Sequence, residues 1–164
     1  MLKLINQLDA TCDREQNYKY MLSIVESLLK DEKNLTANLS NISAVINMYV
    51  DTINWAGFYI LEGDCLVLGP FQGKPACVRI PLGKGVCGAC AESKKTLIVK
   101  NVHEFEGHIA CDSDSNSEIV IPILKDGVVF AVLDIDSPIV DRFSELEEKY
   151  LTQLAALLEN LLII

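Results

Sequence analysis

The sequence predicts an α+β domain in which helices from both ends of the chain pack on one face of a central antiparallel sheet of about six strands. Three observations support this: helical periodicity near both termini, strand-like apolar runs between them, and short turns that join those runs into hairpins. The length of 164 residues suits one domain. We therefore expect a single domain over 1–164, with N-terminal helices at about 16–50, a sheet and its loops at about 54–137, and a C-terminal helix at about 143–162.

The helices are predicted from apolar residues that recur every three or four positions. This pattern runs through residues 16–30 and again through 35–50, with polar residues between the apolar ones. The last helix follows Ser144, which suits an N-cap, and Glu147 stands three positions later. A serine and a glutamate at this spacing are typical of a capping box, so we expect the helix to begin there.

The middle of the chain predicts strands. Residues 54–73 are rich in aromatic and β-branched side chains and contain an Glu-Gly-Asp turn, which indicates a hairpin. Residues 118–137 predict a second hairpin, in which Lys-Asp-Gly forms the turn. Between the hairpins we expect strands at 76–82 and 96–102, with a short helix between them. A long stretch with little periodicity then precedes the second hairpin, and loops of that length are usually functional or disordered.

Charge and composition exclude several classes of function. The net charge of −9 and the scattered basic residues argue against nucleic acid as a partner. The N-terminal residues lack the apolar core of a signal peptide, and no apolar run is long enough to span a membrane. We therefore expect no membrane partner and a cytoplasmic location. In that compartment the six cysteines are expected to be free, catalytic or metal-binding rather than structural disulfides.

Cys87 and Cys90 form a CxxC motif, which can be a redox dithiol or half of a zinc site. The surrounding pattern is antiparallel and lacks the βαβ unit of a thioredoxin-like motif. Zinc would need further ligands, and only His103, His108 and Cys111 are available, without a second CxxC. We therefore expect a glycine-rich turn and no metal site, and we assign neither histidine a catalytic role.

Two pairs of residues each occupy one face of a strand. Trp55 and Tyr59 are either core aromatics or a wall for a small apolar or thioether group. Asp134 and Asp136 are either a solvated strand end or a paired acidic site that receives an ammonium group or shares a proton. Glu118 lies on the neighbouring strand of the same hairpin, so three carboxylates can converge.

Three cysteines are placed differently along the predicted elements. Cys77 is expected on a strand, Cys87 at the start of the short helix, and Cys111 on the long loop. A catalytic thiol needs access and thiolate character, and the loop gives Cys111 access. Asp112 and Asp114 would raise its pKa, so a nucleophilic Cys111 needs compensation from substrate charge or a helix N-terminus.

Three long motifs carry a resemblance to a known family: "GPFQGKPACVRIPLGKGVCG" (69–88), "GHIACDSDSNSEIVIPI" (107–123) and "VLDIDS" (132–137). Together they resemble the free methionine-(R)-sulfoxide reductases, which are single GAF-domain enzymes. The resemblance implies a GAF fold and reduction of the R epimer of free methionine sulfoxide. It also implies no bound cofactor, with thioredoxin as the reductant and NADPH supplying electrons through thioredoxin reductase.

The resemblance also implies roles for individual residues. Cys111 matches the nucleophile, and Cys77 or Cys87 matches the resolving cysteine; we favour Cys77 and leave Cys87 as resolving or auxiliary. The substrate pocket falls on five residues, namely Trp55, Tyr59, Glu118, Asp134 and Asp136. Cys90 departs from the family pattern and could pair with Cys87.

These inferences combine into one chemical hypothesis. Carboxylates hold the substrate ammonium, Trp55 packs on the terminal methyl, and one protonated carboxyl group activates the sulfoxide oxygen. Cys111 becomes a sulfenic acid, and a resolving thiol converts it to a disulfide that thioredoxin reduces. The alternative is a small-molecule-sensing GAF module without turnover. A homodimer through the first and last helices is also expected.

Overall fold

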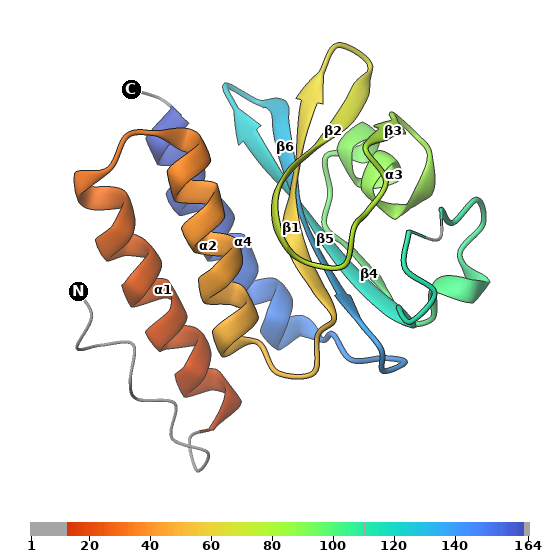
Figure 1. Ribbon diagram of the computed structural model, residues 1–164, viewed down its shortest axis with the longest axis horizontal. Helices are drawn as coiled ribbons and strands as arrows, with labels where there is room; N and C mark the ends of the chain where they lie inside the picture. Colours follow the sequence, from red (N-terminus) through yellow and green to blue (C-terminus); the bar gives the residue numbers. More distant parts are fainter. Residues whose placement is uncertain (1–12, 110, 163–164) are drawn as a thin grey trace.

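The computed structural model describes residues 13–109 and 111–162 (Figure 1). The sequence signal against a signal peptide comes mainly from residues 1–12, which lie outside the described residues. In chain order the elements are α1 (Arg14–Asp31), α2 (Leu35–Tyr49), β1 (Trp55–Glu62), β2 (Cys65–Gly73), β3 (Arg79–Pro81), α3 (Gly85–Ser93), β4 (Leu97–Val99), the 3₁₀ turn η1 (Val102–Glu104), β5 (Ser117–Lys125), β6 (Val128–Ser137) and α4 (Glu145–Leu162). Among the described helices, none combines the length and apolar character that a membrane span requires.

The strands form one antiparallel sheet in the order β3-β2-β1-β6-β5-β4. The first and last hairpins meet at its centre, where β1 pairs with β6. Helices α1, α2 and α4 lie on one face, and the short helix α3 lies on the other (Figure 1). The predicted α+β fold, with a central antiparallel sheet and terminal helices on one face, is confirmed.

One strand is shorter than predicted, and a cysteine that was expected on it lies on a loop instead. The strand expected at 76–82 is reduced to Arg79–Pro81, so Cys77 lies on the loop after β2 and not on a strand. Pro75 has no backbone N–H to donate to a ladder, which favours an irregular path here. The strand expected at 96–102 is likewise reduced to Leu97–Val99.

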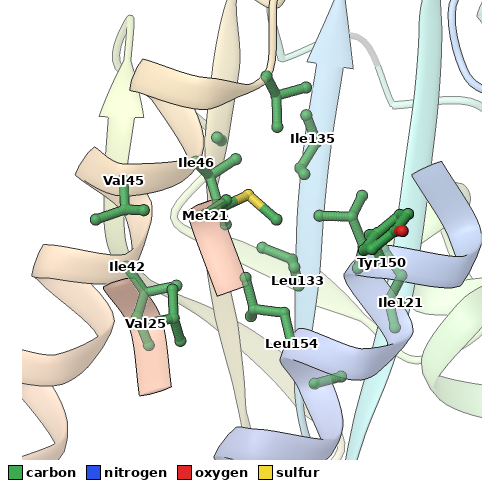
Figure 2. Packing of buried hydrophobic residues seen from close by; sticks show 14 of the residues in the cluster. Met21, Val25, Ile42, Val45, Ile46, Ile121, Leu133, Ile135, Tyr150 and Leu154 are labelled. Carbon is green, nitrogen blue, oxygen red and sulfur yellow. The ribbon is translucent and has the colours of Figure 1, made fainter. Parts of the chain in front are cut away.

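Alternation along β6 separates the core from the opposite face. Leu133 and Ile135 point to the helices, where they are fully buried among Met21, Ile46 and Leu154 (Figure 2). The residues between and after them therefore point to the other face, because successive side chains of a strand alternate. The large core on the helical side thus fixes the register that places acidic residues on the other side.

A buried ion pair joins the start of α4 to α1 and the loop after α2. Arg142 Nη1 donates to Glu147 Oε1 at 2.9 Å, and the Tyr18 hydroxyl donates to the same oxygen at 2.7 Å. The other oxygen accepts from the Ser144 amide and hydroxyl, which confirms the predicted capping box. Although burial acts to raise it, these hydrogen bonds lower the pKa of Glu147 to about 2.

We predict that Glu147→Ala lowers the free energy of unfolding by about 3–5 kcal/mol, because it leaves the Arg142 guanidinium buried with one carboxylate partner fewer. Glu26→Ala, on an exposed stretch of α1, is the matched control and should change it by less than about 0.5 kcal/mol. Urea denaturation measures both. Since the pKa of Glu147 is lowered from 4.5, its contribution is complete above pH 4.5 and is lost as the pH falls toward 2. Equal stability of the two variants at neutral pH would contradict this account.

Candidate active site

A pocket lies on the face of the sheet opposite the three long helices. It is lined from β1, the loop after β2, α3, the loop before β5, and the strands β5 and β6. Seven of the eight residues predicted from the sequence line it, namely Trp55, Tyr59, Cys87, Cys111, Glu118, Asp134 and Asp136. The eighth, Cys77, is bonded to one of them. The fold thus gathers residues that are far apart in the sequence into one place.

The carboxylates come from the two paired strands of the last hairpin. Glu118 on β5 is directly opposite Asp136 on β6, and Asp134 lies two positions before Asp136 on the same face. Glu118 and Asp134 are each only 6% exposed. One oxygen of Asp134, Oδ1, is buried without a hydrogen-bond partner. The acidic residues are therefore a site inside the protein and not a solvated strand end.

Burial is the main reason that the acidic side chains resist ionisation. It raises the pKa of Asp134 to about 6. It raises the pKa of Glu118 well above its usual value, and the charges of Asp134 and Asp136 raise it further. Burial, followed by the charge of Asp134, also raises the pKa of Asp136 well above its usual value. The group can therefore hold a proton near neutral pH, where an isolated carboxyl group would be ionised.

The two aromatic residues of β1 form one wall and also hold the loop that carries Cys77. The rings of Trp55 and Tyr59 stack with centroids 5.9 Å apart. The indole Nε1 donates to the carbonyl of Lys74 at 3.1 Å, and the Tyr59 hydroxyl donates to the carbonyl of Cys77 at 3.0 Å. A Cβ on Gly57 would overlap the Trp55 ring, so glycine is required between them.

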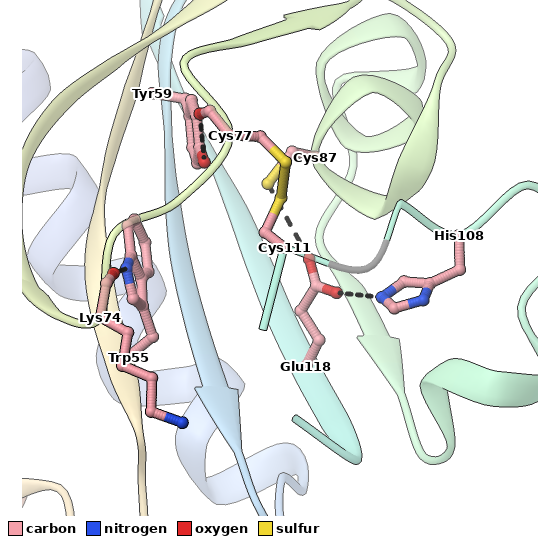
Figure 3. The surroundings of a disulfide bond; sticks show 8 residues. All are labelled: Trp55, Tyr59, Lys74, Cys77, Cys87, His108, Cys111 and Glu118. Atoms are coloured by element: carbon pink, nitrogen blue, oxygen red, sulfur yellow. Dashed lines mark hydrogen bonds and ion pairs between the residues drawn. A yellow bond between two sulfur atoms is a disulfide. The ribbon is translucent and has the colours of Figure 1, made fainter. Parts of the chain in front are cut away.

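Cys77 and Cys111 form a disulfide at the pocket, with Cα atoms 5.6 Å apart (Figure 3). The bond joins the loop after β2 to the loop before β5, across 34 positions of sequence. Both cysteines are partly exposed. Sequence reasoning named Cys77 and Cys87 as possible partners of Cys111, and the structure pairs Cys111 with Cys77.

Cys87 and Cys90 remain free thiols on α3 and point to different partners. The Cys87 thiol donates to Glu118 Oε1 at 3.8 Å, inside the pocket. The Cys90 thiol donates to the carbonyl of Val120 at 3.6 Å and does not line the pocket. Burial is the first cause that raises the pKa of both thiols, to about 12 for Cys90. In this structure the CxxC motif is therefore not a disulfide, and neither thiol is a standing thiolate.

A lysine lies beside the acidic residues that follow Cys111. Lys74 Nζ is 3.3 Å from Asp112 Oδ1 and also pairs with Asp114. Asp112 further accepts from Asn54 Nδ2 at 3.1 Å. These contacts tie the two disulfide-bearing loops together and offset negative charge next to Cys111. Sequence reasoning noted the two acids but missed Lys74, because its partners are nearly forty positions away.

His108 and Ser115 also line the pocket; sequence reasoning considered His108 only as a possible zinc ligand and did not single out Ser115. His108 Nε2 lies 3.9 Å from Glu118 Oε2 (Figure 3), and burial, followed by the charge of His103, lowers the pKa of His108. Ser115 accepts from Asn54 Nδ2 at 3.0 Å. Both belong to the irregular loop, where no periodicity indicates which side chains point inward. His103 instead contacts Asn116 and lies outside the pocket.

Comparisons with known proteins identify the family to which the chain belongs. A family model for the GAF domain matches residues 34–162. The chain is 51% identical over 136 residues to the free methionine-R-sulfoxide reductase of Escherichia coli strain K12, across 83% of this chain and 82% of that protein. The structure of fRMsr of Staphylococcus aureus in complex with substrate has a TM-score of 0.85 and 50% identity, and the match covers 89% of this chain and 95% of that one.

A further solved structure is the free methionine-R-sulfoxide reductase of Neisseria meningitidis in complex with its substrate. It has a TM-score of 0.90 and 42% identity, over 93% of this chain and 92% of that chain. These identities extend over most of both chains, and the fold matches as well as the sequence. The chain therefore belongs to the GAF domain family and, within it, to the free methionine-R-sulfoxide reductases, so it is an oxidoreductase.

Proposed function

We propose that this protein reduces free L-methionine-(R)-sulfoxide to methionine, with Cys111 as the nucleophile and Cys77 as the resolving cysteine. The observation that carries the proposal is the Cys77–Cys111 disulfide beside a pocket that contains buried carboxylates and stacked aromatic rings. Relatives named for this reaction, two of them solved with their substrate, support the substrate assignment.

The chemistry of the pocket suits a small zwitterion with a thioether-like end. Among the described lining residues, His108 is the single basic side chain, against four carboxylates. The substrate ammonium supplies positive charge that the protein itself lacks there, and it binds the carboxylates. The terminal methyl and sulfur pack on Trp55, because an aromatic face makes favourable contacts with both. A residue within a peptide has no α-ammonium, so the acidic group rejects it.

A protonated carboxyl group activates the sulfoxide. Its high pKa keeps a proton on the Glu118–Asp136 pair, which donates a hydrogen bond to the sulfoxide oxygen and then transfers the proton. Protonation withdraws electrons from sulfur and makes it electrophilic. The Cys111 sulfur attacks, the oxygen passes from the substrate sulfur to Cys111 as the S–O bond of the substrate breaks, and Cys111 is left as a sulfenic acid. Methionine leaves reduced by two electrons, and Cys111 is oxidised by two.

The resolving step uses the loop that Trp55, Tyr59 and Lys74 hold. The Cys77 thiol attacks the sulfenic sulfur of Cys111, a disulfide forms and water leaves. Thioredoxin then reduces the disulfide by exchange, and thioredoxin reductase returns thioredoxin to its reduced form with electrons from NADPH. A reaction that depends on this reduction cycle places the enzyme in the cytosol. Lys74 neutralises part of the acidic charge beside Cys111, and the bound ammonium adds to this effect. A sensing module without turnover would use the pocket but has no need of this disulfide.

We predict that Cys111→Ser lowers turnover by about a thousandfold or more, because serine is a far weaker nucleophile toward sulfur. Cys77→Ser should release one methionine per protomer in a first turnover and then lose steady-state activity, since the cysteine that pairs with Cys111 is missing. The assay measures methionine release from racemic free methionine sulfoxide with thioredoxin, thioredoxin reductase and NADPH.

Cys65→Ser is the matched control, because Cys65 is a free thiol on β2 outside the pocket. It should keep full activity. An active Cys111→Ser protein, or consumption of more than half of the racemate, would overturn the assignment.

The raised pKa of Asp134 should make the stability of the protein depend on pH. Its pKa is raised from 3.8 to about 6 in the folded state, so its ionisation destabilises the fold. This destabilisation is absent below the pKa of Asp134 in the unfolded state and complete above its pKa in the folded state. The difference between the two pKa values corresponds to about 3 kcal/mol. Asp134→Asn should therefore stabilise the protein by about 1 kcal/mol more at pH 8 than at pH 5.

Urea denaturation at the two pH values measures this difference. Asp64→Asn is the matched control, because Asp64 is exposed in the turn between β1 and β2, and a surface substitution of this kind should change stability by less than about 0.5 kcal/mol. A stabilisation by Asp134→Asn that is equal at pH 5 and pH 8, or larger at pH 5, is inconsistent with a raised pKa.

A further inference from the structure

In the pocket, the Cys87 thiol, which the proposed reductase steps do not use, lies beside two of the carboxylates that they do use. The Cys87 sulfur, a carboxylate oxygen of Glu118 and a carboxylate oxygen of Asp134 all lie within 4.8 Å of one another. They come from three elements, α3, β5 and β6, and all three residues are buried. Cys87 stays a free thiol while Cys77 and Cys111 are paired, so its sulfur is available for another bond.

The spacing of these atoms suits a metal ion of the zinc type. Zinc binds sulfur at about 2.3 Å and oxygen or nitrogen at about 2.0–2.2 Å in a tetrahedron, so neighbouring ligand atoms stand about 3.3–3.8 Å apart. The thiol and Glu118 Oε1 are already 3.8 Å apart. Magnesium and calcium prefer six or more oxygen ligands, whereas a thiolate selects a softer ion. The ligand set therefore favours zinc and its heavier analogue cadmium.

An independent observation also indicates that a partner is missing here. Asp134 Oδ1 is buried without a hydrogen-bond partner, and the residue as a whole is only 6% exposed. A buried acceptor of this kind is normally satisfied, because leaving it unpaired is costly. All three residues line the pocket, where His108 Nε2 lies 3.9 Å from the second oxygen of Glu118.

We propose that Cys87, Glu118 and Asp134 form a buried binding site for a thiophilic divalent cation, with Zn²⁺ as the physiological candidate. On binding, the S–H bond of Cys87 breaks, a sulfur–metal bond forms, and the proton passes to solvent. No electron is transferred. The metal takes the same carboxylates that receive the substrate ammonium in the proposed function, so metal and substrate exclude each other. The cation is then a reversible inhibitor of the reductase.

The test uses the full chain in its disulfide form, where Cys77 and Cys111 cannot bind metal. Titration with Co²⁺ should show one ion per protomer, with the sulfur-to-cobalt charge-transfer absorption of a thiolate ligand, and added Zn²⁺ should displace it. Cys87→Ser should remove that absorption and weaken Zn²⁺ binding at least a hundredfold. Asp134→Asn, which preserves side-chain shape, should weaken binding about tenfold and guards against misfolding of the cysteine variant.

Cys90→Ser is the matched control, since Cys90 lies on the same helix but bonds to the carbonyl of Val120. It should bind cobalt like the wild type. The site is refuted if no stoichiometric ion binds, if Cys87→Ser binds like the wild type, or if the Cys90→Ser protein loses the absorption.

A separate measurement tests whether the metal ion and the substrate compete for the pocket. L-methionine should weaken Zn²⁺ binding more than D-methionine does, because both chelate free zinc equally but only the L form fits the pocket. Equal effects of the two enantiomers would overturn the mutual exclusion. Metal binding itself is measured without turnover, so its failure is distinct from failure of the proposed reductase function, which the cysteine variants test.

Discussion

The structure of the site depends on burying carboxylates on one face of the sheet without a permanent countercharge. The register of β5 and β6 enforces this, because the same alternation that sends Leu133 and Ile135 into the helical core sends Asp134 and Asp136 to the opposite face. The large core fixes the register, and a one-residue slip would reverse both faces. The stability of the helical layer thus maintains an arrangement that is itself unfavourable.

The surrounding elements can be understood as consequences of that constraint. Burial raises the pKa of Glu118 and Asp136, so a proton is retained where the proposed chemistry needs an acid. A ligand with an ammonium group, or a divalent cation, relieves the missing charge. The two loops at the pocket are held by contacts with Trp55, Tyr59 and Lys74, and they bring the disulfide partners together. Recognition and redox chemistry therefore share one set of residues.

The sequence contained enough information for the elements and for much of the site, but not for its irregular parts. Periodicity located the long helices and both hairpins, and the two-residue spacing of Asp134 and Asp136 placed them on one face. Irregular loops have no such period. Cys77 was therefore assigned to a strand when it lies on a loop, Lys74 was not identified, and His108 was given no role in the site. The choice between Cys77 and Cys87 as the resolving cysteine also depended on loop geometry, which the spacing of cysteines in the sequence does not encode.

Recognition of the substrate ammonium by the buried carboxylates can be measured by comparing two substrates that differ only at the amino group. The kcat/KM of the reduced enzyme with thioredoxin should be measured for free methionine-(R)-sulfoxide and for its N-acetyl derivative, which keeps the sulfoxide but has no ammonium group. A site that leaves buried polar groups unpaired rejects an analogue by about 10⁴-fold, so we expect a loss of that order. Values for the two substrates within tenfold of each other would contradict the account.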